Sequence, residues 1–199
     1  MTHKTIMNHF YAAIPGWFYF QDLYENIAAS AKDGDHYVEV GAWKGRSTAF
    51  LATEIANSGK NIQFDVIDTW EGSKEHLAGG AYEDQDVING TLFETFKNNM
   101  KPVEGYYNPI RTTSLEAAKQ YQDNSLNFVL LDASHSYEDV SADIIAWLPK
   151  VKVGGILAGD DYHYSWPGVI KAVNELLPGA AISPGYANYG SWSWIKKTT

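Results

Sequence analysis

The segment from Val38 to Thr48, VEVGAWKGRST, constrains the fold more than any other part of the chain. It passes from apolar residues typical of a buried strand into two glycines, Gly41 and Gly45, and then into helix-forming sequence. A strand, a glycine turn and a helix start make up the first half of a nucleotide-binding βαβ unit. Glycines allow backbone N–H groups to approach a ligand closely, and a helix N-terminus offers unpaired donors to an anionic group.

The spacing of these glycines restricts the ligand. The pattern is Glu39-x-Gly41-x-x-x-Gly45-x-Ser47, which lacks the middle glycine of the G-x-G-x-x-G dinucleotide fingerprint. Trp43 stands where a pyrophosphate would need a bare backbone, and there is no G-x-x-x-x-G-K-[ST] phosphate loop. We therefore expect a nucleoside ligand without a phosphate chain. An ordinary strand–turn–helix without a ligand is the alternative.

Chain length and charge exclude several classes of protein. With 199 residues, we expect one domain at 1–199 that is long enough to bury a full core. The net charge of −9 argues against nucleic acid as the main partner, although a cationic ligand stays open. The absence of cysteine excludes disulfides and thiolate metal sites. Neither a signal pattern nor a membrane-spanning apolar run is present, so we expect a soluble, cytoplasmic protein without a membrane partner.

Hydrophobic periodicity divides the chain into an N-terminal helical segment, 1–35, and a Rossmann-like core, 36–199. The N-terminal aromatics should pack on the core, or, near Trp17, form part of a substrate mouth. Further strands are expected at 62–70, 106–111, 126–134 and 156–158, the last after a turn at 154–155, with a closing hairpin at the C-terminus. Ser114 would cap the helix that it begins, contact a base, or do both.

Polar residues follow the ends of four predicted strands: Glu39, Asp68, Asp132 with His135, and Asp160 with Asp161. Ligands of parallel α/β sheets bind at the carboxyl ends of the strands, so these side chains should converge. Asp68 closes the second strand, where an acidic residue meets the ribose of a bound nucleoside. A carboxylate suits this position because it only accepts hydrogen bonds, and a ribose diol donates two.

Three of these carboxylates form a candidate metal site. Asp132, Asp160 and Asp161 are hard oxygen donors, which suit Mg²⁺, Ca²⁺ or Mn²⁺ rather than zinc. Three carboxylates at one rim would repel each other unless a cation or hydrogen-bond donors offset them. Capping of a loop by Asp160 or Asp161 is the alternative. His135 beside them is suited to act as a general base, with a metal ligand or a surface residue as the other interpretations.

The chain resembles the class I S-adenosylmethionine-dependent methyltransferases in four segments taken in order, VEVGAWKGRST, FDVIDTW, LLDASHSYEDVSADIIAWLP and GGILAGDDY. More narrowly, it resembles the metal-dependent O-methyltransferases, which include catechol O-methyltransferase and the macrocin-type sugar O-methyltransferases. The segments span Val38 to Tyr162. The resemblance implies an α/β fold, namely a single doubly wound Rossmann-like domain. Its seven-stranded sheet would be mostly parallel, with a C-terminal antiparallel hairpin.

The resemblance also implies which residues bind the donor, S-adenosylmethionine: Glu39, Gly41, Trp43, Gly45, Ser47, Asp68, Ser114 and Asp132. In this set, Ser47 would hold the methionine carboxylate at the helix N-terminus, Asp68 would bind the ribose diol, and Ser114 would lie by the adenine.

For catalysis, the resemblance implies a divalent ion, most readily Mg²⁺, held by Asp132, Asp160 and Asp161. His135 falls at the position of the base, which is a lysine in the catechol enzymes and a histidine in the macrolide sugar enzymes. This favours a sugar-like or aliphatic hydroxyl over a catechol. The third metal position is often Asn in the catechol branch and is Asp161 here, and residues 1–30 match nothing that defines the acceptor.

The function predicted from the sequence is therefore O-methylation of a small-molecule hydroxyl, with His135 and Asp132 as catalytic residues. A nicotinamide-dependent oxidoreductase on the same fold is one alternative, and the incomplete glycine fingerprint argues against it. A catalytically silent adenosyl-binding subunit is another, and the intact acidic rim argues against that. The acceptor, the metal and any homo-oligomeric state are not specified by the sequence.

Overall fold

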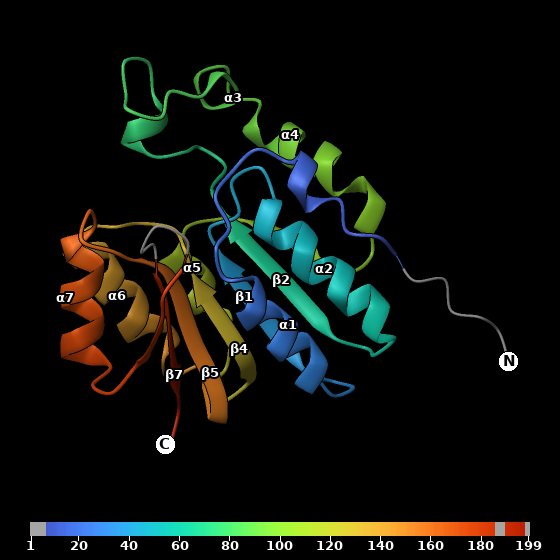
Figure 1. Cartoon of the computed structure of the whole chain (residues 1–199), viewed down its shortest axis with the longest axis vertical. Helices are drawn as coiled ribbons and strands as arrows, with labels where there is room; N and C mark the ends of the chain where they lie inside the picture. Colours follow the sequence, from blue (N-terminus) through green and yellow to red (C-terminus); the bar gives the residue numbers. More distant parts are fainter. Residues whose placement is uncertain (1–6, 186–189, 198–199) are drawn as a thin grey trace, which may run out of the picture.

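A computed structural model describes residues 7–185 and 190–197 (Figure 1). Its centre is a seven-stranded sheet in the order β3-β2-β1-β4-β5-β7-β6. The strands are β1 (His36–Val40), β2 (Gln63–Asp68), β3 (Asn108–Arg111), β4 (Leu126–Leu131), β5 (Val151–Tyr162), β6 (Ala181–Ser183) and β7 (Gly190–Ile195). Strands β3, β2, β1, β4 and β5 pair in parallel, whereas β7 is antiparallel to both β5 and β6. The predicted mostly parallel sheet with an antiparallel C-terminal hairpin is confirmed.

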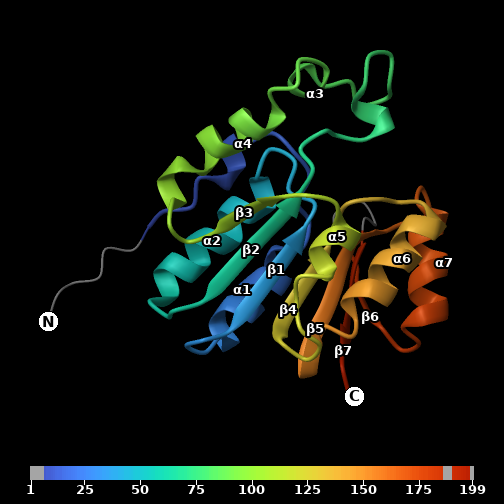
Figure 2. The same cartoon turned by 180° about the vertical axis from the view of Figure 1, so that it is seen from behind.

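Helices cover both faces of the sheet (Figures 1 and 2). One face carries α1 (Gln21–Ser30) and α2 (Arg46–Ser58), and the other carries α5 (Ser114–Ala118), α6 (Tyr137–Trp147) and α7 (Pro167–Leu176). The helix α4 (Leu92–Met100) packs into the core on the α1–α2 side. Strand order reverses between β1 and β4, which is the switch point where doubly wound sheets bind ligands.

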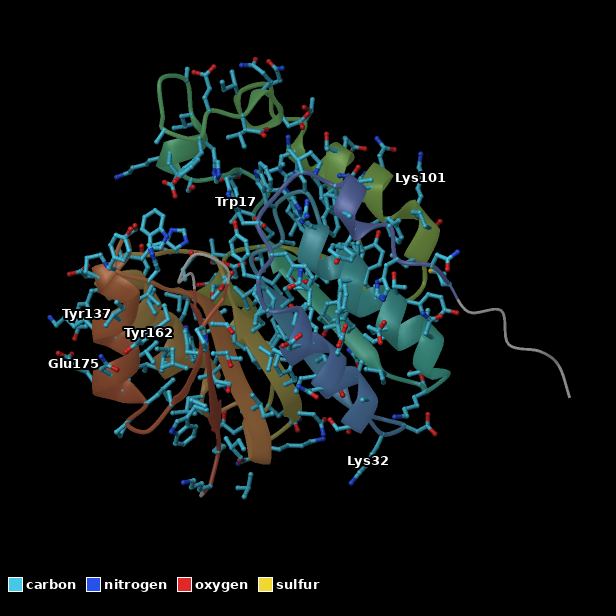
Figure 3. The ribbon with its side chains drawn as sticks, viewed as in Figure 1. Trp17, Lys32, Lys101, Tyr137, Tyr162 and Glu175 are labelled. Atoms are coloured by element: carbon cyan, nitrogen blue, oxygen red, sulfur yellow. The ribbon has the colours of Figure 1, made fainter. Side chains whose placement is uncertain are left out.

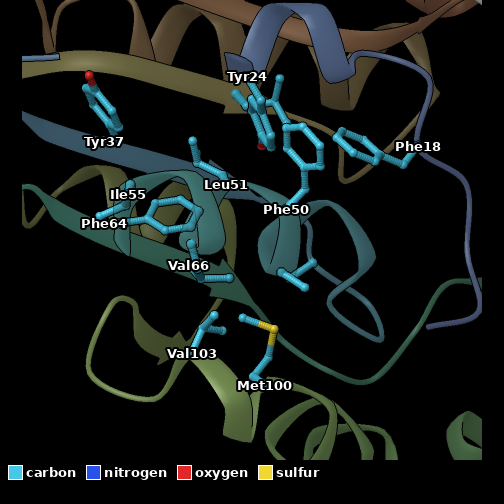
Figure 4. Close-up of a cluster of buried hydrophobic side chains, with 14 of the residues drawn as sticks. Phe18, Tyr24, Tyr37, Phe50, Leu51, Ile55, Phe64, Val66, Met100 and Val103 are labelled. Carbon is cyan, nitrogen blue, oxygen red and sulfur yellow. The ribbon is translucent and has the colours of Figure 1, made fainter. Parts of the chain in front are cut away.

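Each layer of helices encloses its own apolar cluster. In Figure 4, Phe50 and Leu51 of α2 pack with Tyr24 of α1 and with Phe64 of β2. The cluster on the other face is built around Trp147 of α6 and the side chains that surround it. Outside the core, the Tyr137 hydroxyl donates to Glu175 at 2.7 Å, which joins α6 to α7 (Figure 3). These clusters hold the strand ends, and so the loops that follow them, in fixed positions.

Two predictions about local structure are wrong. Trp17 and Phe18 precede α1 in irregular chain, so the N-terminal segment is helical mainly over Gln21–Ser30. The glycine pair at 154–155 does not form a turn before a strand, as predicted, but lies inside β5. Glycine is accommodated there because the register between β4 and β5 shifts at this point, and Gly154 adopts a φ of +82°. Residues 1–6 of the predicted helical segment lie outside the described residues.

Four short elements complete the described chain: the 3₁₀ turns η1 (Tyr11–Ala13), η2 (Lys74–His76) and η3 (Lys101–Val103), and α3 (Gln85–Ile88). Within residues 7–185 and 190–197, no helix combines the length and the apolar character needed to cross a bilayer.

Candidate active site

A cavity of about 400 Å³ opens at the carboxyl ends of β1, β2, β4 and β5. Its wall includes the glycine turn after β1 and the residues that follow β2, β4 and β5. The segment 71–91, called the flap here, projects past this edge of the sheet (Figure 1) and adds Glu75, His76 and Tyr82 to the wall. The cavity therefore lies at the switch point, as the convergence of the predicted polar residues requires.

Gly41 allows the glycine turn to approach the loop after β4. It has a φ of +93°, and a Cβ atom built on it would lie 2.0 Å from the carbonyl oxygen of Asp132. Val40, one residue before, accepts a hydrogen bond from the Asp132 N–H at 2.8 Å. A side chain at position 41 would push these two loops apart, so the cavity depends on glycine here. Gly45, with a φ of +91°, is the N-cap residue just before α2.

Glu39 lies beneath this turn rather than in the cavity wall. It is fully buried, and its carboxylate accepts hydrogen bonds from Ser47 at 2.5 Å and from Thr48 at 2.7 Å. Burial raises the pKa of Glu39 to about 7, although these hydrogen bonds counteract the effect. Glu39 is thus placed to hold the first turn of α2 against β1, while Ser47 itself lines the cavity.

Asp68 binds the backbone of the glycine turn. One carboxylate oxygen accepts hydrogen bonds from the N–H groups of Ala42 and Trp43, at 2.8 and 2.9 Å, and the other accepts from Trp70 at 2.7 Å. A carboxylate has about four acceptor sites, so roughly one remains for a ligand hydroxyl. The indole N–H of Trp43 is buried and has no hydrogen-bond partner among the described residues. Both groups could serve a polar ligand in the cavity.

The residues after β4 meet the last residues of β5 at a rim of the cavity. The Nε2 atom of His135 lies 2.7 Å from a carboxylate oxygen of Asp161, and its ring stacks on Trp166 with centroids 4.0 Å apart. Asp132, His135 and Asp161 each place one ligand atom within 4.8 Å of the others. We call these three residues the rim group. Asp161 has a φ of +60°, a costly conformation for Asp that recurs at functional sites.

The rim group differs in one member from the predicted metal set. His135 takes part in it, whereas Asp160 lies next to it, buried, with one carboxylate oxygen that has no partner in the described structure. Burial and the charge of Asp161 raise the pKa of Asp160 to about 8, and burial with both neighbouring carboxylates raises the pKa of Asp132. A divalent cation would offset this repulsion, so the residues present fit such an ion.

The prediction that Ser114 caps its helix is wrong. Thr113 is the cap, because its hydroxyl accepts the N–H of Glu116, whereas Ser114 donates to buried Asp143 and accepts from the Trp147 indole at 2.9 Å. Burial raises the pKa of Asp143 to about 6, against the effect of this hydrogen bond. Ser114 nevertheless lines the cavity, so its predicted place beside an adenine stays a prediction.

No role was predicted for the flap from the sequence, although the flap contacts both sides of the cavity. Lys44 of the glycine turn forms ion pairs with Asp84 and Asp86 of the flap, at 2.6 and 2.9 Å. His76 stacks on Trp43 at 5.7 Å, and Trp17 stacks on the same ring at 5.4 Å. Figure 3 shows Trp17 where the flap meets the rest of the molecule. The sequence signal that could have identified the flap as part of the site is a loop rich in Gly and acidic residues after a strand end.

Comparison with known proteins identifies the family. The family model described as a methyltransferase domain matches residues 38–162, which is more than half of the chain. The chain belongs to this methyltransferase family. The matched region includes the glycine turn, Asp68 and the whole rim group, and class I enzymes of this kind use S-adenosylmethionine as the methyl donor. The suspected family is confirmed.

Solved structures share the fold of this methyltransferase at low sequence identity. The O-methyltransferase NovP is 18% identical with a TM-score of 0.61, over 89% of this chain and 78% of that one. CalS11, a TDP-rhamnose 3′-O-methyltransferase of calicheamicin biosynthesis, is 16% identical with a TM-score of 0.57, over 88% and 76%. A protein of Corynebacterium glutamicum is 13% identical with a TM-score of 0.63, over 94% and 85%.

One relative by sequence is a much longer protein. The uncharacterized protein y4gI of Sinorhizobium fredii is 27% identical over 124 residues. The match covers 62% of this methyltransferase but 13% of that protein. The similarity therefore concerns one region of y4gI.

Proposed function

We propose that this methyltransferase transfers a methyl group to a hydroxyl of a small molecule, with a divalent cation at the rim. The observation that supports this most is the rim group, Asp132, His135 and Asp161, in a cavity that the glycine turn also lines. A base and hard oxygen ligands beside a donor pocket suit the activation of a hydroxyl. The similarity to a sugar O-methyltransferase makes a sugar-like hydroxyl a reasonable first acceptor to test.

The donor would lie along the glycine turn. S-adenosylmethionine supplies a methyl group on a sulfonium, which leaves as a thioether when the new bond to oxygen forms. Asp68 would accept a hydrogen bond from the ribose with its remaining acceptor site, and Ser47 at the start of α2 would bind the methionine carboxylate. The bare backbone at Gly41 lets the glycine turn lie against the loop after β4, which keeps this part of the cavity wall in place for the ligand.

The rim would hold the acceptor hydroxyl and remove its proton. Asp132 and Asp161 would bind the divalent cation, which lowers the pKa of a hydroxyl beside it. His135 would accept the proton. Asp161 is placed to orient the imidazole through the 2.7 Å contact to Nε2, and Trp166 supports the ring. The other ring nitrogen of His135, Nδ1, faces the flap, where it lies 3.8 Å from Oε1 of Glu75.

Two measurements test this function. Calorimetric titration should show binding of S-adenosylmethionine and S-adenosylhomocysteine, and no binding of NAD. A screen of sugars and aliphatic alcohols with methyl-labelled donor should then find label on oxygen, with turnover that is lost in chelator and restored by Mg²⁺ or Mn²⁺. Tighter binding of NAD would favour an oxidoreductase, and donor binding without turnover across the screen would favour a silent subunit.

A further inference from the structure

The flap contributes a carboxylate to the cavity that the proposed reaction does not use. Glu75 lines the cavity, and its Oε1 atom lies 3.8 Å from Nδ1 of His135. No Lys or Arg of the described chain forms an ion pair with it. A carboxylate without a Lys or Arg partner among the described residues therefore faces the cavity.

Aromatic side chains form the neighbouring part of the wall. Trp17 is 50% exposed although one face stacks on Trp43, and Tyr82 of the flap meets Trp17 edge to face at 5.3 Å. All three rings line the cavity, as does Trp166 on the His135 side. The faces of aromatic rings carry negative potential, and they attract cations that lie over them.

Positive charge is scarce on the same wall. Among the described residues that line the cavity, Arg46 is the one Lys or Arg side chain. One Nη atom of its guanidinium donates to the carbonyl of Ile14 at 2.8 Å and the group lies over the Tyr11 ring, whereas its Nε has no partner among the described residues. No Lys or Arg of the described chain pairs with Glu75, so a phosphate or carboxylate of an acceptor beside Glu75 would be repelled.

We propose that the acceptor carries a positively charged nitrogen near its reactive hydroxyl, and that Glu75, Trp17 and Tyr82 bind this nitrogen. The substrate class is thus an amino alcohol or an amino sugar without a phosphate. The proposal rests on the proposed function, because it names the acceptor of the same site. Glu75 and the two rings would select the substrate, whereas the rim group would act on its hydroxyl.

The test uses two probes that differ in charge alone. Choline and its neutral isostere 3,3-dimethyl-1-butanol both have a primary hydroxyl and a branched head of similar volume. Their affinities are measured by calorimetry for the intact protein saturated with S-adenosylhomocysteine and Mg²⁺. We expect choline to bind at least about tenfold more tightly, the range of a desolvated cation–π contact with a carboxylate nearby. Glu75→Gln should remove this preference, and Trp17→Ala should reduce it.

Glu71→Gln is the matched control, because Glu71 is an exposed carboxylate of the same flap that does not line the cavity. It should leave the preference unchanged. Equal affinity for the two probes, no measurable binding of either, or a preference that survives Glu75→Gln would overturn the proposal. The affinity for S-adenosylhomocysteine and the turnover in the acceptor screen are measured separately, so a failure of the proposed function appears as absent donor binding or absent turnover in the wild type, and a failure of this proposal appears in the two probes.

Discussion

At the scale of single residues, Glu39 shows that a carboxylate beside a binding turn can act without facing the ligand. The resemblance places Glu39 in the donor pocket, whereas in the structure its carboxylate accepts hydrogen bonds from the hydroxyls of Ser47 and Thr48. A buried carboxylate costs free energy unless it is protonated or well hydrogen-bonded, and here two hydroxyls donate to it. Its predicted contact with the donor stays a prediction, and its link to the α2 N-terminus is what the structure adds.

The raised pKa of Glu39 makes stability depend on pH. Between its ordinary value of 4.5 and about 7, the folded protein keeps a proton that the unfolded chain has released. The contribution of Glu39 to the free energy of unfolding therefore falls by about 3 kcal/mol as the pH rises through this window, and it is constant above it. Glu39→Gln cannot ionise and should lose this dependence. Denaturant unfolding of both proteins at a series of pH values measures it, and a difference that does not vary with pH would contradict the assignment.

His135 is placed to be either the base or a metal ligand, and one variant separates the two roles. As the base, His135→Ala should lower turnover by roughly 10²–10⁴-fold and leave Mg²⁺ affinity nearly unchanged, which is the result we expect. Asp161→Asn is the comparison, because it removes a charged oxygen of the rim group and should weaken Mg²⁺ binding. Calorimetric metal titration reads out both variants. An equal loss of metal affinity in His135→Ala would make His135 a ligand.

At the scale of elements, the flap and the glycine turn depend on each other. The amino group of Lys44 bridges Asp84 and Asp86, and these side chains are mostly buried. Val87 of the flap is 8% exposed and belongs to the apolar cluster on the α1–α2 side, which adds a second anchor. These ion pairs could not be predicted from the sequence, because they join Lys44 to residues far along the chain. The local sequence of the flap has only the pattern of a solvated acidic loop.

Removal of the Lys44 bridge should loosen the flap while the core stays folded. In Lys44→Met, amide hydrogen exchange over residues 71–91 should become faster, because two partly buried ion pairs are lost. Exchange in β1 and β4 should remain as in the wild type. Lys97→Met is the control, since Lys97 pairs with Glu94 in an exposed i,i+3 contact outside the flap, and such pairs contribute little. Unchanged exchange over 71–91 would show that other contacts hold the flap.

At the scale of the whole molecule, the sequence was informative where a pattern is local and repeated. The apolar run of β4 predicted a central strand, because a buried parallel strand needs continuous apolar residues, and the glycine turn after β1 predicted a strand followed by a helix and a ligand beside it. The glycine pair at 154–155 was predicted to be a turn before a strand, and this is wrong because its position inside β5 depends on the register between β5 and β4. Similarly, helix capping, one of the two roles predicted for Ser114, is wrong because its partners Asp143 and Trp147 come from α6.

Ligand binding should stabilise the entire domain and identify the ligand class. A ligand present at 100 times its dissociation constant adds about 2.7 kcal/mol to the free energy of unfolding. For a domain of this size, each kcal/mol raises the melting temperature by roughly 2–4 °C, so S-adenosylhomocysteine should raise it by about 5–10 °C. NAD at the same concentration should cause no shift, because the glycine turn has Trp43 at the position of the middle glycine that a bound pyrophosphate needs. Gly41→Ala should abolish the shift, since its Cβ would meet the Asp132 carbonyl. A larger shift with NAD would instead assign the cavity to a dinucleotide.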